Sequence, residues 1–178
     1  MLGDSDEALM ARIATGDRAA FHMLAQRHAA PVIALAAHIL GNRAEAEDVA
    51  QDAMLRVWIN APRWKPLAKF RSWLTRIVVN LCLDRRRRAP WVGLDAAGEI
   101  ADPAPDPRAR REAAESERAI AAAIAKLPPR QRAAIALTYS EGLSNVQTAD
   151  ILDTSVSAVE TLLSRAKDSL RRTLAEKD

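Results

Sequence analysis

The stretch from Ala89 to Pro107 lacks any hydrophobic periodicity and separates two segments that have it. It holds four of the nine prolines, two of the six glycines and four acidic residues. A stretch without an apolar face cannot bury enough surface to fold, and proline interrupts regular structure. We therefore expect a linker. Fully extended, about 19 residues span on the order of 60 Å, so the flanking halves need not touch.

Both flanking segments are patterned as helices. Apolar residues recur at spacings of three and four, and no stretch sustains the alternation of β-branched residues that strands require. The helices expected in the first half span 17–40, 43–60 and 69–88. Those expected in the second half span 108–125 and 129–140, followed by two helices joined by a tight turn. The expected fold is all-α, with a helical domain at 1–89, an acidic linker at 90–107 and a second helical domain at 108–178.

General features of the chain narrow the class of protein. A length of 178 residues suits one or two small domains. The single cysteine, Cys82, has no partner for an internal disulfide or a cysteine-based zinc site. No apolar run approaches the roughly 20 residues of a membrane helix, and the acidic N-terminus is unlike a secretory signal. We expect a soluble cytoplasmic protein without membrane insertion.

The net charge of +3 conceals a basic block. Residues 61–90 carry nine basic side chains and one acidic side chain, which is typical of a polyanion contact. Trp64, Phe70 and Trp73 are interleaved with these charges, a composition that suits stacking on single-stranded bases. Phe70 and Trp73 also lie on an apolar helical stripe, which favours the core. Trp64 lies in a loop between prolines, where it is either an exposed aromatic or a loop anchor.

The C-terminal segment predicts a helix-turn-helix motif. Gly142 ends one helix, Ser144 and Gln147 form a capping box for the next, and 153–155 supplies the turn. A generic helical hairpin is the alternative. Short polar and basic side chains on such a final helix can reach base edges in the major groove, and arginines at its far end suit phosphates. The outward side chains are Thr161, Ser164, Arg165 and Lys167, with Arg171 and Arg172 at the far end.

An acidic face on the helix at 43–60 permits two interpretations. Glu45, Asp48, Gln51 and Asp52 lie on one side, as in helical nucleotide pyrophosphatases that bind magnesium. That site would need a second helix with matching carboxylates, and the acid nearby, Asp84, is crowded by arginines. A solvated face, or a docking face for a basic partner, fits better. We expect no cofactor, no metal and no catalytic site, because no catalytic motif is present and the histidines lack ligand spacing.

Three motifs in this order resemble one known family. They are Ala46 to Trp58, the segment Phe70 to Ile77 with Asn80 and Asp84-Arg85, and the set formed by Leu127 to Arg132, Glu141 to Ser144 and Ser155 to Arg172. Together they resemble a bacterial extracytoplasmic-function (ECF) sigma factor, a minimal member of the sigma-70 family. The resemblance covers nearly the whole chain.

The resemblance implies partners and roles for these residues. The partners would be core RNA polymerase, promoter DNA as duplex and as melted strand, and an anti-sigma factor that no residue here identifies. Polymerase would bind Glu45, Asp48, Gln51, Asp52 and Arg56. The minus-10 element would contact Arg63, Trp64, Lys65, Arg71, Arg76, Asn80, Arg85, Arg87 and Arg88. The minus-35 element would contact Ser157, Thr161, Ser164, Arg165, Lys167, Arg171 and Arg172.

Some residues depart from the family pattern, and other functions remain open. Glu160 and Leu162 stand where many relatives have basic residues. This departure bears on which bases the final helix contacts and does not affect the expectation that the helix is present. The main expectation is a transcription initiation factor that is not an enzyme. The alternatives are a helix-turn-helix regulator that binds duplex DNA without polymerase and a magnesium-dependent nucleotide hydrolase.

Overall fold

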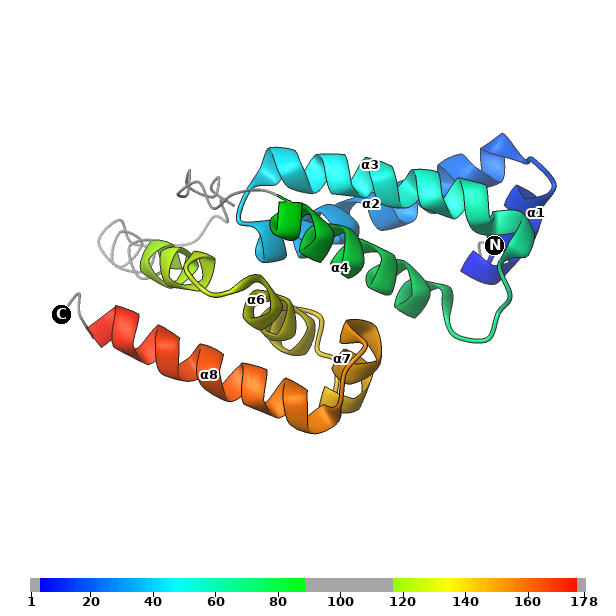
Figure 1. The fold of residues 1–178 in the computed structure, drawn as a ribbon. Helices are drawn as coiled ribbons and strands as arrows, with labels where there is room; N and C mark the ends of the chain where they lie inside the picture. Colours follow the sequence, from blue (N-terminus) through cyan, green and yellow to red (C-terminus); the bar gives the residue numbers. More distant parts are fainter. Residues whose placement is uncertain (1–3, 89–116, 176–178) are drawn as a thin grey trace, which may run out of the picture.

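The fold is known from a computed structural model, which describes residues 4–88 and 117–175 (Figure 1). All regular structure in these two ranges is helical, as expected. The linker expected at 90–107 and the first part of the helix expected at 108–125 lie outside the described residues. Residues 117–125 are helical.

The first half folds as a helical bundle whose helix ends follow from local chemistry. Its elements are α1 (Asp6–Ala14), α2 (Arg18–Leu40), α3 (Arg43–Asn60), the 3-10 turn η1 (Ala61–Arg63) and α4 (Phe70–Arg88). The Asp17 carboxylate accepts a hydrogen bond from the Ala20 amide at 3.0 Å and so caps α2. Gly41 ends the same helix with φ of 70°, a conformation that glycine adopts without strain.

The apolar stripes expected from the sequence form the core of this half. Phe70, Leu74 and Val78 on α4 are buried, as are Val49 and Val57 on α3. Other members of these stripes are partly buried, namely Met54, Trp58, Trp73, Ile77 and Leu81. Helical periodicity therefore predicted the buried faces correctly and overestimated the burial of several side chains on them.

The second half contains the expected helix-turn-helix. After residues 117–125 come α6 (Pro129–Ile135), the π-helical turn η2 (Ala136–Ser140), α7 (Asn145–Leu152) and α8 (Val156–Ala175). The capping box of Ser144 and Gln147 starts α7, with both reciprocal hydrogen bonds present. Asp153 ends α7 in the left-handed conformation, and the Ser155 hydroxyl accepts from the Ala158 amide at the start of α8. One difference is that the helix expected at 129–140 changes from α to π geometry at Ala136.

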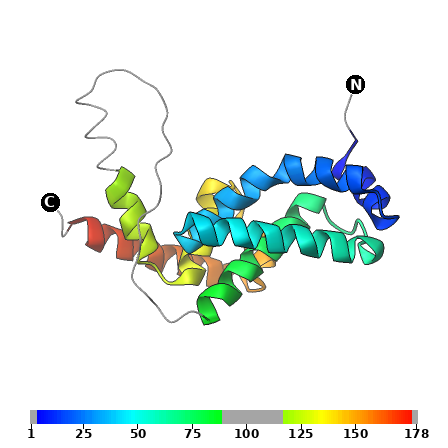
Figure 2. The same cartoon turned by 90° about the horizontal axis from the view of Figure 1, so that it is seen from above.

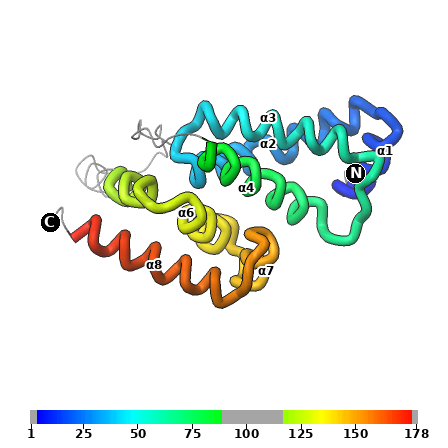
Figure 3. Tube along the Cα trace, in the orientation of Figure 1, coloured from blue at the N-terminus to red at the C-terminus, as the bar shows by residue number. Residues whose placement is uncertain are grey.

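The two halves pack against each other. Elements α6, η2 and α7 contact α2 and α4, while α8 lies on the outer side of α6 and α7 (Figures 1 and 2). The Cα trace shows the same order, with the yellow and orange α6 and α7 between the green α4 and the red α8 (Figure 3). Among the described residues, no helix combines the length and apolar character needed to cross a membrane.

Candidate nucleic-acid interface

The outer side of α3 carries most of the predicted polymerase-binding residues. Asp48, Gln51, Asp52 and Arg56 are all exposed, as their spacing predicted. Glu45 is less accessible, because it lies 3.2 Å from the Arg86 guanidinium in an ion pair. The outer side of α3 is thus an acidic surface with one partly buried member.

Two apolar residues on the same outer side were missed from the sequence. Leu55 and Ile59 are 56% and 62% exposed, although both are large hydrophobic side chains. Leu55 and Ile59 are four residues apart and lie outside the buried stripe of the helix. Large apolar residues at such positions are expected to be exposed, and this pattern could have identified them from the sequence. Contiguous apolar area on a surface is typical of a protein–protein contact, and these two exposed side chains are one helical turn apart.

The arginines at the end of α4 make different contacts. Arg85 pairs with Asp48 at 2.7 Å, and Arg87 pairs with Asp84 at 2.9 Å. Arg86, which was not predicted as a DNA contact, donates a hydrogen bond to the Leu40 carbonyl at the end of α2. Cations are favourable at a helix C-terminus, so Arg86 joins α4 to α2. The predicted contacts Arg87 and Arg88 are exposed, whereas Arg85 is partly buried.

The loop between η1 and α4 is fixed by an aromatic cluster. The Trp64 ring lies with its centroid 6.2 Å from those of both Phe70 and Trp73, and Phe70 also packs against His28 at 5.2 Å. Trp64 is partly buried, so of the two roles considered for it the geometry favours the loop anchor, with one side still accessible. Its exposed neighbours Arg63 and Lys65 are held on either side of this anchor.

The open side of α4 carries Arg71, Arg76 and Asn80, all exposed. Their spacing places Arg76 and Asn80 one turn apart on the same side. Arg71 forms an ion pair with Glu141 at 2.9 Å, and Arg76 donates a hydrogen bond to the Asp150 carbonyl. Two of the predicted minus-10 residues therefore contact the second half of the chain.

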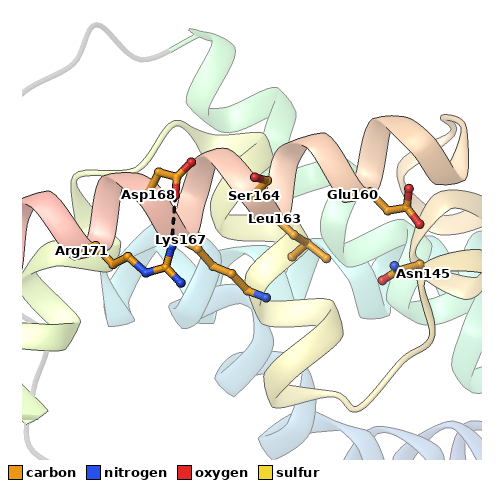
Figure 4. A pocket seen from close by; sticks show the side chains of 7 residues that line it. All are labelled: Asn145, Glu160, Leu163, Ser164, Lys167, Asp168 and Arg171. Carbon is orange, nitrogen blue, oxygen red and sulfur yellow. Dashed lines mark hydrogen bonds and ion pairs between the residues drawn. The ribbon is translucent and has the colours of Figure 1, made fainter.

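The predicted minus-35 residues on α8 are all exposed but form two groups. Ser164, Lys167 and Arg171 line an open hollow of about 350 Å³, together with Asn145 at the start of α7 (Figure 4). Glu160 and Asp168 line the same hollow, and Asp168 pairs with Arg171 at 3.3 Å. The remaining members, Ser157, Thr161, Arg165 and Arg172, do not line it.

Lys167 has a further contact within the second half. Its ammonium lies 5.5 Å from the centroid of the Tyr139 ring, a cation–π geometry. Contacts of this kind hold a flexible side chain near one position. Lys167 thus contacts Tyr139 and also lines the hollow beside α7.

No group suited to a metal is found within residues 4–88 and 117–175. There, no three histidine, cysteine or carboxylate side chains gather closely enough to hold an ion. The thiol of Cys82 is buried, and burial raises its pKa to about 12. Such a thiol is a poor nucleophile and a poor metal ligand at neutral pH.

Comparison with known proteins places these surfaces in a family. Residues 24–92 match Sigma-70 region 2, and residues 117–170 match Sigma-70, region 4. The chain is 36% identical over 173 residues to the ECF RNA polymerase sigma factor SigM of Mycobacterium tuberculosis, covering 96% of this chain and 85% of SigM. The chain belongs to the sigma-70 family, in its ECF group. It is therefore an RNA polymerase sigma factor, a transcription initiation factor.

Two further relatives are similar over nearly their full length. The sigma factor is 32% identical over 176 residues to the ECF RNA polymerase sigma factor SigW of Bacillus subtilis, covering 93% of this chain and 94% of SigW. The structure of CnrH in complex with the cytosolic domain of CnrY matches it with a TM-score of 0.67 and 30% identity. That match covers 98% of this sigma factor and 100% of CnrH.

Proposed function

We propose that this sigma factor guides core RNA polymerase to promoters through three surfaces, one each on α3, on η1 with α4, and on α8. The observation that carries the proposal is the placement of the three predicted residue sets: the polymerase set on α3, the minus-10 set on η1, the loop after it and α4, and the minus-35 set on α8. Their members are exposed or partly exposed, and Arg85 of the minus-10 set pairs with Asp48 of the polymerase set at 2.7 Å, so the surfaces on α3 and α4 adjoin. We assign the polymerase and minus-10 surfaces to a domain at 1–89 and the minus-35 surface to a domain at 108–178.

The surface on α3 is suited to a protein partner. Asp48, Asp52 and Arg56 supply charge, while Leu55 and Ile59 supply apolar area that a partner can bury. Charge sets orientation and association rate, and burial of the apolar side chains supplies affinity. We assign this surface to core RNA polymerase.

The surface on α4 is suited to a melted DNA strand. The Asn80 amide can both donate and accept hydrogen bonds at a base edge, and Arg76 can bind a neighbouring phosphate. Capturing an unstacked base costs a few kcal/mol, which contacts to base and phosphate must offset. Trp64 holds Arg63 and Lys65 beside this strand, so the loop serves as an anchored contact.

The surface on α8 is suited to duplex DNA. Ser157, Thr161 and Arg165 carry short polar and basic groups near the start of the second helix of the helix-turn-helix, where base edges are read. Arg172 lies near the far end and suits a phosphate. Glu160 lies within this surface, so its carboxylate narrows the set of bases that the helix can approach.

Further parts of the proposal concern partners and location. An anti-sigma factor is a proposed partner, supported by the relative CnrH, whose structure was solved with the cytosolic domain of CnrY. A protein that works on polymerase and promoter DNA acts in the cytoplasm. We propose that it has no catalytic activity of its own and that polymerase performs the chemistry.

Run-off transcription with purified core polymerase on fragments of the source genome tests the proposal. We expect start sites that require this sigma factor. Asp48→Arg should weaken polymerase binding by about tenfold, since it reverses a charge in the contact. Glu47→Arg is the matched control, because Glu47 is exposed on the same helix outside the predicted set. Asn80→Ala should preserve polymerase binding and reduce promoter opening, measured by permanganate reactivity of unpaired thymines.

The outcomes separate the alternatives. A helix-turn-helix regulator without polymerase contact would bind duplex DNA and yield no dependent start site. Equal loss of polymerase affinity in Asp48→Arg and Asn80→Ala would mean that the surfaces on α3 and α4 are wrongly assigned.

A further inference from the structure

The start of α4 takes its acidic cap from a distant helix. The first four residues of α4, 70–73, include no acidic side chain, and Lys69 precedes them. The amides of a first turn have no partner within their own helix, and negative charge nearby stabilises them. The Glu7 carboxylate on α1 accepts a hydrogen bond from the Phe70 amide at 3.4 Å, across 63 residues of chain. Helix α1 therefore supplies a charge that the sequence of α4 does not contain at its start.

A second link joins α1 to the same residue through α2. The Asp6 carboxylate lies 2.8 Å from Nε2 of His28, which is 8% exposed. The His28 ring packs edge-on against the Phe70 ring, with centroids 5.2 Å apart. Arg27 pairs with the other oxygen of the Asp6 carboxylate at 2.5 Å, so this carboxylate is held from two sides. Phe70 is thus fixed through its amide by Glu7 and through its ring by His28.

The loop between η1 and α4 rests on Phe70. This side chain is fully buried, and Trp64 packs on it from the other end of the loop, with ring centroids 6.2 Å apart. Between these two rings the chain runs through residues 65–69, which are all exposed. Helix α1 also contacts η1, just before Trp64, and lies beside this turn (Figure 1). Both ends of the loop 64–69 are therefore tied to α1.

Helix α1 is seated firmly enough to act as a support. Leu9, Met10 and Ile13 are buried in the core of the first half, and their burial anchors the helix. A separate ion pair joins Asp4 to Arg12 at 2.5 Å. This pair involves neither His28 nor Phe70, so it provides an internal control for the links to the loop.

We propose that α1 is a positioning element for promoter opening, which holds Phe70 and thereby sets the loop 64–69 against the melted strand. Glu7 acts directly on Phe70, and Asp6 acts through His28. The proposal rests on the function assigned above to η1 and α4. A loop that is held in its binding geometry before the strand arrives loses less conformational entropy on binding. Loosening the loop therefore weakens capture of the unstacked base and reduces discrimination between bases at that position.

The position of the loop is measured by fluorine NMR of the full-length chain labelled with fluorotryptophan. The chain has four tryptophans, and Trp64→Phe identifies the resonance of Trp64. The double variant Asp6→Asn with Glu7→Ala should shift and broaden this resonance, because the ring loses its fixed support. Asp4→Asn removes the pairing of Arg12 with Asp4 on the same helix and should leave the resonance unchanged.

Promoter opening is measured with core polymerase by permanganate reactivity of unpaired thymines. The double variant should form about fivefold fewer open complexes at equal polymerase affinity, the factor expected from the loss of one hydrogen bond of typical strength. Glu7→Gln keeps an oxygen that accepts from the Phe70 amide, so it should open promoters better than Glu7→Ala does. Asp4→Asn should match wild type.

Base selectivity separates positioning from a general loss of structure. Run-off transcription is compared on two promoters that differ in one minus-10 base. The ratio of the two products should fall toward one in the double variant, because a loosened loop discriminates less between the bases. A general loss of folded protein lowers both products together and leaves the ratio unchanged. Circular dichroism confirms that each variant is folded.

Each outcome decides a different part of the proposal. An unchanged Trp64 resonance in the double variant would overturn the support of the loop by α1. A displaced resonance with normal opening would rule out a role in promoter opening. Reduced opening at an unchanged product ratio would assign α1 a purely structural role and refute positioning. The function of α4 is judged separately: if Asn80→Ala opens promoters normally, that assignment fails whatever the variants of α1 do.

Discussion

Replacing Glu45 with glutamine should destabilise the folded protein far more than the same change at its neighbour Asp48. Both carboxylates lie in α3 and both pair with the arginine run of α4, at 3.2 Å to Arg86 and 2.7 Å to Arg85. Their surroundings differ. The Glu45 and Arg86 side chains are 32% and 19% exposed, whereas those of Asp48 and Arg85 are 59% and 36% exposed.

The expected loss of unfolding free energy depends on how well solvent compensates the arginine that loses its carboxylate partner. Breaking a buried pair by removing one partner costs about 3–5 kcal/mol of unfolding free energy, because an uncompensated charge remains. Since Glu45 is about one-third exposed, we discount this range to about 1–3 kcal/mol for Glu45→Gln. The first turn of a helix favours negative charge, which acts in the same direction. Asp48→Asn breaks a mostly exposed pair and should cost at most about 1 kcal/mol.

Urea unfolding followed by tryptophan fluorescence measures both changes, since Trp58, Trp64 and Trp73 lie in the half that contains α3. A third variant separates charge from packing, because the buried Arg132 on α6 reaches the Leu40 carbonyl that Arg86 also uses. If the cost arises from two uncompensated guanidinium groups, then adding Arg132→Met to Glu45→Gln should recover part of it, because an apolar side chain of similar length removes one buried charge. Equal costs for Glu45→Gln and Asp48→Asn, or no recovery by Arg132→Met, would refute the reasoning.

Two further predictions concern local structure. Ser144→Ala removes the N-cap of α7 and should lower the free energy of unfolding by about 1 kcal/mol in the same urea assay, whereas Ser157→Ala, a substitution at an exposed position on α8, should change it little. Burial raises the pKa of the Cys82 thiol from 9.0 to about 12, so the folded state keeps its proton where the unfolded state loses it. Stability from this group is complete below pH 9 and declines as pH rises toward 12. Cys82→Ala should reduce that decline, and Cys82 should react with thiol reagents at neutral pH only through unfolding.

The helices could be predicted from the sequence where their ends carry local signals. Asp17 and Gly41 bound α2, and Ser144 and Asp153 bound α7, by bonds and backbone angles that depend on a few neighbouring residues. Helix α1 was missed although Ser5 caps it through a hydrogen bond from the Ala8 amide. A helix of nine residues offers little periodicity, so the usable signals were its cap and its acidic first turn, Asp6 and Glu7.

Helical periodicity predicted which side chains of the candidate surfaces are exposed, but it did not predict their contacts with distant segments of the chain. Spacing correctly placed Asp48 and Asn80 on exposed sides, because exposure follows from the buried stripe opposite. Spacing could not separate Arg86 from its exposed neighbours, since its role depends on the Leu40 carbonyl, 46 residues earlier in the chain. Arg132 depends on the same carbonyl at a separation of 92 residues. Such roles are set by tertiary packing.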